Sequence, residues 1–329
     1  MTPDDPAAAL ESLVLGDAPA YTRADIIRLS GVSDDLARSL WRALGFPDTG
    51  GEAAFTDADL EALRTVHDLI ERGLMDDETA IILARSLGQS TARLADWQTE
   101  AMGRFLVEQE HLEGRDLTAD PDVVARILER AGALIDPLER LLDYAWRRQL
   151  AAVLDRRLAR TEVIGEPGGT GTVGFADLVG FTRLSRQLED ADLAALVERF
   201  EGVSADVLAG SGATLVKTVG DEILYVADDA ATAAEAALRL HDAHAQDPDV
   251  PEMRIGLASG PVLRRMGDVF GATVNLASRL TALARPGTTL VDAATARDVS
   301  SLSGFSLRQM APRRVRGVGI VRSFSLTAG

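Results

Sequence analysis

Apolar residues recur at spacings of three and four through most of the first half of the chain, as at Leu60, Leu63 and Val66. This spacing puts them on one side of a helix, and Thr, Ser or Asp often precedes such a segment, as an N-cap residue would. The pattern predicts that residues 21–160 are helical. Its last part, residues 144–160, has one apolar stripe surrounded by arginines and predicts a basic amphipathic connector helix that packs against a partner helix.

A different pattern begins after a Gly/Pro-rich segment, residues 165–171, which we interpret as a linker. Short apolar stretches then alternate with helical ones. The predicted strands are residues 172–178, 213–219, 222–226, 253–258 and 288–291, and the predicted helices are 182–208, 229–245 and 273–284. Gly220-Asp221 between two strands indicates a hairpin. Strand, helix, hairpin, helix and strand is the order of a ferredoxin-like α+β core.

The two patterns indicate two domains, and the length of 329 residues also exceeds what one hydrophobic core usually organises. We expect an all-α domain over residues 1–143, a connector helix and linker over 144–171, and an α+β domain over 172–329.

Composition narrows the possible locations and partners. The chain has no cysteine, which excludes disulfides, thiolate metal sites and cysteine nucleophiles. Its first residues lack a basic targeting region, and no apolar run approaches the roughly 18 residues that a membrane span needs. We therefore expect a cytoplasmic protein without a membrane partner.

The net charge of −17 is concentrated at the front of the chain. Residues 1–143 hold 29 acidic residues and 13 arginines, a net −16, which leaves −1 for the remainder. An acidic surface repels nucleic acid, so we expect no nucleic-acid partner. Lys217 is the only lysine, which indicates a position where a compact ammonium is needed, unless it is simply a solvated surface residue.

Two aspartates stand where strands end. Asp177 closes an apolar strand, and Asp221 lies in the predicted hairpin. Because these strands are adjacent in a ferredoxin-like sheet, the two carboxylates can meet at one edge and hold Mg²⁺, which prefers hard oxygen ligands. The strand-to-helix turn after Asp177 offers free backbone N–H groups to a phosphate chain. Taken singly, an aspartate at the end of a strand is more often a helix cap, and a Gly-Asp hairpin is usually only a turn.

A third segment adds an amide and a guanidinium. Asn275 and Arg279 are four residues apart and share one face of a predicted helix, with Leu276 and Leu280 on another. An isolated pair of this kind is usually a surface hydrogen bond, so the pair gains meaning only beside the two aspartates.

Together these segments resemble the signature of class III adenylyl and guanylyl cyclases, over roughly residues 170–329. The matching segments are Phe-Ala-Asp-Leu-Val-Gly-Phe-Thr ending at Thr182, Lys-Thr-Val-Gly-Asp-Glu beginning at Lys217, and Asp268 followed by Asn275 and Arg279. The resemblance implies an adenylyl cyclase that makes 3′,5′-cyclic AMP and pyrophosphate from ATP with two Mg²⁺ or Mn²⁺ ions per site. It implies Asp177, Asp221 and Leu178 at the metals, Lys217, Asp268, Phe181, Thr182 and Arg316 at the substrate, and Asn275 and Arg279 in catalysis. Arg313 and Arg314 are close enough to replace Arg316.

The implied roles agree with the chemistry of adenine. Asp268 would accept from the exocyclic amine and Lys217 would donate to a ring nitrogen, whereas guanine offers an acceptor and a ring N–H at these places. These mismatched buried polar groups would disfavour GTP by a factor on the order of 10² or more, so ATP is the expected substrate.

The resemblance also implies a head-to-tail homodimer. In the family, metal ligands from one chain meet purine-reading and transition-state residues from the other. All of these residue types occur in this chain, so two equivalent sites per homodimer are expected.

The front domain resembles two kinds of protein. Residues 21–64 are similar to the start of a MerR-type helix-turn-helix, but five arginines against eight acidic residues argue against DNA binding. The two-domain arrangement resembles actinobacterial soluble cyclases in which a helical front domain restrains catalysis, in some with pH dependence. His67 and His111 are the only front-domain histidines, and each is more typical of surface or core hydrogen bonding than of proton sensing.

Four other functions remain open from the sequence: a guanylyl cyclase, a diguanylate cyclase with a similar Gly-Asp-Glu hairpin, a catalytically silent nucleotide sensor, and an acidic transcription factor. A diguanylate cyclase would have no use for Asp268 or for the pair of Asn275 and Arg279.

Overall fold

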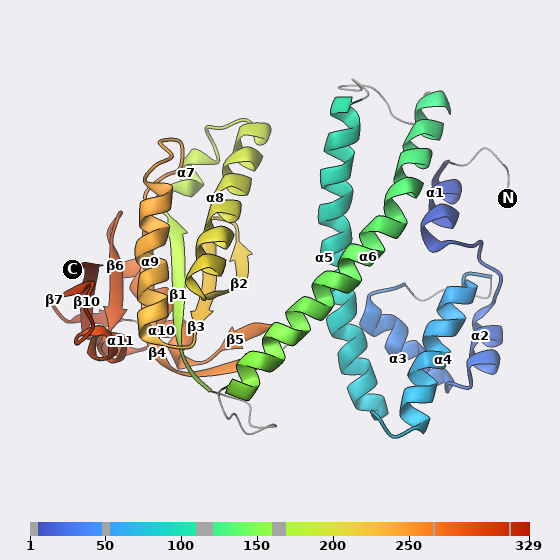
Figure 1. Cartoon of the computed structure of the whole chain (residues 1–329), viewed down its shortest axis with the longest axis horizontal. Coiled ribbons are helices and arrows are strands. Elements are labelled where there is room, and N and C mark those ends of the chain that lie inside the picture. Colours follow the sequence, from blue (N-terminus) through green and yellow to red (C-terminus); the bar gives the residue numbers. More distant parts are fainter. Residues whose placement is uncertain (1–5, 48–52, 110–120, 160–168, 266, 316) are drawn as a thin grey trace. The chain divides into compact units, whose positions relative to one another are not determined.

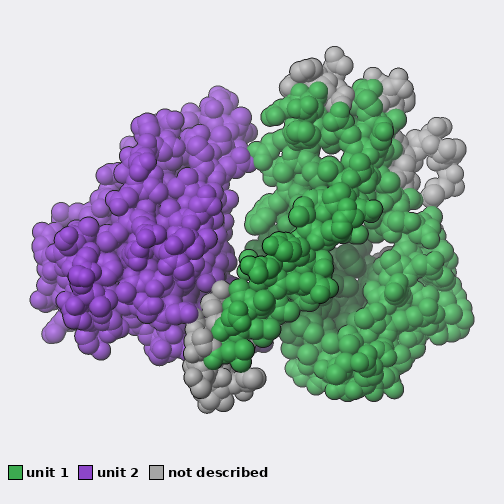
Figure 2. All heavy atoms as spheres, in the orientation of Figure 1, with its two compact units in different colours: residues 1–159 green, residues 160–329 purple. Residues whose placement is uncertain are grey.

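The computed structural model describes residues 6–47, 53–109, 121–159, 169–265, 267–315 and 317–329. Its contacts divide the chain into two compact units, residues 1–159 and 160–329 (Figures 1 and 2). Among the described residues, no helix combines the length and the apolar character that crossing a bilayer would require.

The first unit is helical, as predicted. Its helices are α1 (Pro6–Leu15), α2 (Arg23–Ser30), α3 (Asp34–Leu44), α4 (Asp57–Glu71), α5 (Asp77–Gln109) and α6 (Pro121–Ala159). Side-chain caps fix three of the starts: Thr22 and Thr56 form capping boxes, and Ser33 accepts from the Leu36 N–H. Residues 144–159 of the predicted connector are the second half of α6, so the helix runs without a break through the expected domain boundary at residue 143, and residue 160 lies outside the described residues.

The second unit has the predicted strand and helix order. Its elements are β1 (Gly169–Leu178), α7 (Phe181–Leu184), α8 (Asp190–Ser211), β2 (Thr214–Val219), β3 (Glu222–Ala227), α9 (Ala230–His244), β4 (Met253–Arg265), β5 (Asp268–Phe270), α10 (Ala272–Leu283), β6 (Thr289–Asp292), α11 (Ala293–Val299), β7 (Phe305–Gln309), β8 (Arg313–Val315), β9 (Gly319–Val321) and β10 (Ser323–Ala328). The main sheet has the order β2-β3-β1-β4-β6-β10-β7, and its first four strands are antiparallel neighbours, as in a ferredoxin-like core.

Three predictions of extent were wrong. The expected helix over residues 182–208 is two helices, because Phe181, Leu184 and Leu188 turn inward onto the core before α8 starts. Strand β1 begins at Gly169, inside the predicted linker, whose first part lies outside the described residues. Strand β4 continues to Arg265 and hairpins onto β5. The sequence analysis also missed β5, α11 and the strands from β7 to β10, which are short or carry polar residues.

The two faces of the sheet are covered differently. Helices α8 and α9 pack side by side on one face, where Phe200, Leu240 and Ile255 are fully buried (Figure 1). Helix α10 packs on the opposite face through Ala277 and Leu280. That face also carries the candidate site, so α10 determines where its side chains lie.

Changing Gly256 to alanine is expected to lower the free energy of unfolding by about 1–3 kcal/mol, because overpacking forces the backbone apart. A Cβ at this position of β4 would press against the Thr281 nitrogen and lie 2.5 Å from the Ala277 oxygen of α10. Urea unfolding followed by circular dichroism measures the change. A Cβ at Gly202 of α8 would meet no atom within 4 Å, so Gly202→Ala serves as the matched control and should not destabilise. Equal midpoints for Gly256→Ala and the unchanged protein would contradict this packing.

Candidate active site

Asp177 lies in a row of three charged residues on adjacent strands. In the strand register it faces Glu222 of β3 on one side and Arg254 of β4 on the other. The Nε and Nη2 atoms of Arg254 each lie 2.6 Å from Asp177 Oδ2, and the Asp177 side chain is only 14% exposed. A guanidinium therefore balances the charge of this half-buried carboxylate.

Asp221 is held close to the end of β1 by its backbone. It follows Gly220, whose φ of 62° makes the tight turn between β2 and β3, and its carbonyl oxygen accepts from the Leu178 N–H at 3.1 Å. Burial raises the pKa of Asp221, and the charge of Asp177 raises it further. Asp177 and Asp221 therefore lie at the same edge of the sheet, near enough for the charge of Asp177 to act on the Asp221 carboxyl group.

Glu222 is a third acid at this edge. Burial raises its pKa most, followed by the charges of Asp177 and Asp221. Mutual repulsion of this kind is what a bound cation would relieve. Carboxylate oxygens suit Mg²⁺ or Mn²⁺, which usually complete their shells with water and substrate phosphate. No three acidic or histidine side chains in the described ranges already form a metal-binding group, so the fit depends on such added ligands.

Lys217 and Asp268, distant in sequence, form an ion pair. Lys217 of β2 lies with its Nζ 2.5 Å from Oδ2 of Asp268, the first residue of β5. The other oxygen of Asp268 accepts from the Val269 N–H at 2.8 Å. Burial alone would raise the pKa of Asp268, but these hydrogen bonds and the lysine charge outweigh it and lower the pKa. The two side chains are 39% and 29% exposed, so a ligand can still reach them.

These charged residues share the sheet face on which α10 packs. Lys217 faces Leu224 in the register, and Leu224 belongs to the cluster buried under α10. Glu222 lies two residues before Leu224 and therefore points the same way, as does its neighbour Asp177.

Helix α10 presents Asn275 and Arg279 from its outer side. Both side chains are exposed, and neither has a hydrogen-bond or ion-pair partner within the described parts of the chain. The helix is fixed beneath them: the Thr281 hydroxyl donates to the Phe175 and Ala277 carbonyls, at 3.3 and 3.0 Å. A free amide and a free guanidinium thus stand on a rigid support.

The other predicted site residues lie as follows. The Leu178 side chain is 2% exposed and has no donor atom, so only its backbone carbonyl could bind a metal. Phe181 and Thr182 open the four-residue helix α7; Phe181 packs against the core, whereas Thr182 is exposed. Arg316 lies outside the described residues. The alternatives Arg313 and Arg314 are exposed on β8.

The sequence analysis did not identify Arg254 or Glu222 as site residues. A signal was available for Arg254: it is the one charged residue in the segment Met253 to Ala258, which is otherwise apolar or glycine. A charge there must face a charged partner. Glu222 is the last residue of the motif that begins at Lys217, and the motif alone gave it no role.

Comparisons with known proteins identify the family of this chain. Residues 165–328 match the family model described as the adenylate and guanylate cyclase catalytic domain. An adenylate cyclase of Streptomyces coelicolor is 44% identical over 98% of this chain and 90% of its own. An adenylate cyclase of Streptomyces griseus is 48% identical over 90% of this chain and 73% of its own. One similar solved structure is the catalytic core of a rhodopsin-guanylyl cyclase with converted specificity, in complex with ATPαS. It covers 49% of this chain and 98% of its own, with 26% sequence identity and a TM-score of 0.46.

Proposed function

Because this chain belongs to the adenylate and guanylate cyclase family, we propose that it converts ATP to 3′,5′-cyclic AMP and pyrophosphate. The observation that carries the choice of ATP is the ion pair between Lys217 Nζ and Asp268 Oδ2. Its carboxylate can accept from the exocyclic amine of adenine while its ammonium donates to a ring nitrogen. Curated relatives similar over most of the chain are adenylate cyclases.

Cyclases of this family use divalent metal ions, and we assign two, Mg²⁺ or Mn²⁺, to Asp177 and Asp221 with the Leu178 carbonyl. When bound, such ions lower the pKa of the ribose 3′-hydroxyl and neutralise the departing pyrophosphate. Arg254 already donates to Asp177. If a cation shared that carboxylate, the guanidinium would be available to substrate phosphates.

The residues of α10 act on the reacting centre. Asn275 orients the ribose, and Arg279 donates to the α-phosphate oxygens as negative charge grows there in the in-line displacement. Phe181 and Thr182 at the start of α7 supply backbone N–H groups to the phosphate chain. Arg316 holds the terminal phosphates, for which Arg313 and Arg314 are the alternatives.

We further propose that the active form is a homodimer with two equivalent sites. The side chains of Asn275 and Arg279 are exposed and have no partner within the described residues, so both are available to a nucleotide that another subunit holds. Metal ligands of one subunit and the purine-reading and α10 residues of the other would complete each site.

A product assay with ATP, GTP and Mg²⁺ or Mn²⁺ tests the function, and Asp268→Ala sharpens it. Cyclic AMP is expected from the unchanged protein, with no product in a chelator. Asp268→Ala should lower kcat/KM for ATP about 10²-fold, because the acceptor for the adenine amine is gone. The preference for ATP over GTP should therefore become smaller. Asp298→Ala, at an exposed acid on α11, is the control. Cyclic di-GMP as the product, or no product with any nucleotide, would contradict the proposal.

The front unit is proposed to regulate the second through α6. This helix begins within the first unit and ends at Ala159, next to the start of the second. Removing residues 1–159 is therefore expected to change kcat by several-fold when the second unit is assayed alone at equal dimer concentration. Unchanged kcat at full dimerisation, checked by light scattering, would exclude this regulation.

A further inference from the structure

Arg254 holds one oxygen of Asp177 and leaves the other free. Its Nε and Nη2 atoms both lie 2.6 Å from Oδ2 of Asp177. The second oxygen, Oδ1, accepts no hydrogen bond from the residues that the structure describes. A guanidinium frequently binds a carboxylate with one donor on each oxygen, whereas here both donors share one oxygen. The Asp177 carboxylate therefore offers a single oxygen to a cation.

The backbone fixes this arrangement. Asp177 and Arg254 face each other directly in the register of β1 and β4. The neighbours of Arg254 in β4, Met253 and Ile255, are at most 2% exposed and hold the strand in the core. The Arg254 side chain is 34% exposed, and its Nη1 atom takes no part in the ion pair. Arg254 can therefore keep Oδ2 of Asp177 while Nη1 serves a substrate phosphate.

The number of free carboxylate oxygens matters for the choice of metal ion. Ca²⁺ takes more oxygen ligands than Mg²⁺ and often binds both oxygens of one carboxylate, whereas Mg²⁺ keeps a small octahedral shell that includes several waters. Mn²⁺ also suits octahedral oxygen sites. A carboxylate limited to one oxygen supplies what Mg²⁺ and Mn²⁺ need and denies Ca²⁺ its bidentate mode.

We propose that Arg254 is a positioning residue that makes the metal site select Mg²⁺ or Mn²⁺ over Ca²⁺, because it keeps Asp177 monodentate. The inference rests on the proposed metal site at Asp177 and Asp221. Charge alone would not give this selectivity, since a guanidinium repels every divalent cation equally. The charge of Arg254 also opposes the rise in pKa that burial causes at Asp221 and Glu222. Its removal should therefore strengthen the binding of all divalent cations, and the selectivity has to be measured as a ratio.

The test measures displacement of Mn²⁺ from the full chain by electron paramagnetic resonance, with Ca²⁺ and Mg²⁺ as separate competitors. The readout is the ratio of the Ca²⁺ concentration to the Mg²⁺ concentration that displaces half of the Mn²⁺, in which an equal effect of charge on both ions cancels. In Arg254→Gln this ratio is expected to fall about 10-fold, because the loss of a residue that orients a metal ligand typically changes metal affinity by that factor or more.

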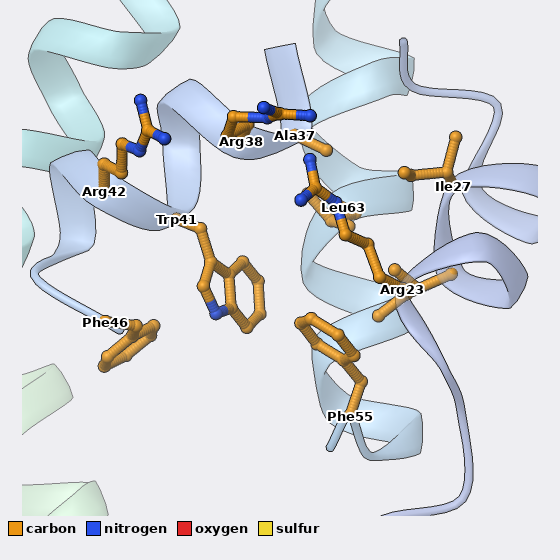
Figure 3. A pocket seen from close by; sticks show the side chains of 10 residues that line it. Arg23, Ile27, Ala37, Arg38, Trp41, Arg42, Phe46, Phe55 and Leu63 are labelled. Carbon is orange, nitrogen blue, oxygen red and sulfur yellow. The ribbon is translucent and has the colours of Figure 1, made fainter. Parts of the chain in front are cut away.

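Arg23→Gln is the matched control. Arg23 is also a partly exposed arginine paired with an aspartate, since its Nη2 donates to Asp34 at 2.7 Å. It lines a small cavity of the first unit between α2, α3 and α4 (Figure 3). The change removes the same charge from the chain outside the proposed metal site, so the ratio should stay that of the unchanged protein.

Arg254→Lys separates geometry from charge and covers the case in which Arg254→Gln fails to fold. Lysine keeps the positive charge but has no planar fork with which to fix the carboxylate through two donors. We therefore expect the ratio to fall in this variant as well. An unchanged ratio in the folded Arg254 variants, or a fall in Arg254→Gln that is absent from Arg254→Lys, would overturn the inference.

Asp177→Asn distinguishes failure of this inference from failure of the metal site. Mn²⁺ binding that is weakened in Asp177→Asn would support the proposed metal site, and an unchanged ratio in the Arg254 variants would then count against the selectivity role of Arg254 alone. Absence of Mn²⁺ binding to the unchanged protein would overturn the metal site and the inference together.

Discussion

Asp177→Asn is expected to lower kcat/KM for cyclic AMP formation by about 10³-fold or more, because the proposed metal site loses one of its charged ligands. The change keeps the size of the side chain. It also removes the charge that Arg254 balances through two contacts of 2.6 Å. A guanidinium beside a neutral amide then competes with the cation for the same space.

Two measurements separate this effect from a loss of structure. Mn²⁺ binding followed by electron paramagnetic resonance should weaken in Asp177→Asn, whereas the unfolding midpoint should stay near that of the unchanged protein. Asp206→Asn, at an exposed acid on α8, is the matched control and should leave both binding and turnover unaltered. Full turnover by folded Asp177→Asn would remove Asp177 from the metal site.

The second large effect concerns the sharing of sites between subunits. Asp221→Ala and Arg279→Ala are each expected to be inactive as homodimers, since every site then lacks either a proposed metal ligand or the guanidinium proposed to act at the α-phosphate. When the two variants are mixed and exchange subunits freely, about half of the dimers contain one of each, and one of their two sites is intact. The mixture should therefore recover about a quarter of the unchanged activity.

The control for this experiment is a mixture of two variants on the same side of the proposed site. Asp177→Ala with Asp221→Ala leaves no intact pair of metal ligands in any dimer, so this mixture should stay inactive. Recovery in neither mixture, after subunit exchange has been verified by mass spectrometry, would show that each site is built from one chain. Recovery in the control mixture as well would show that Asp177 and Asp221 of one chain do not serve the same site.

The residues that the sequence analysis missed show what a local pattern cannot contain. Arg254 matters because the strand register sets it beside Asp177, 77 positions away in the chain. Glu222 gains its raised pKa from burial and from two neighbouring charges, and only the folded sheet supplies either. Spacing along a strand or helix identifies neighbours within one element, whereas the pairing of strands decides which elements are adjacent.

The sequence by itself determined the order of elements around the hairpin, the helical character of the front half and the residue types of the candidate site. These depend on periodicity, turn residues and short motifs, which act over a few positions. Tertiary structure alone decided that residues 182–208 break into α7 and α8 and that Lys217 pairs with Asp268. The physical reason is that burial and cross-strand contact bring together groups that no local spacing relates.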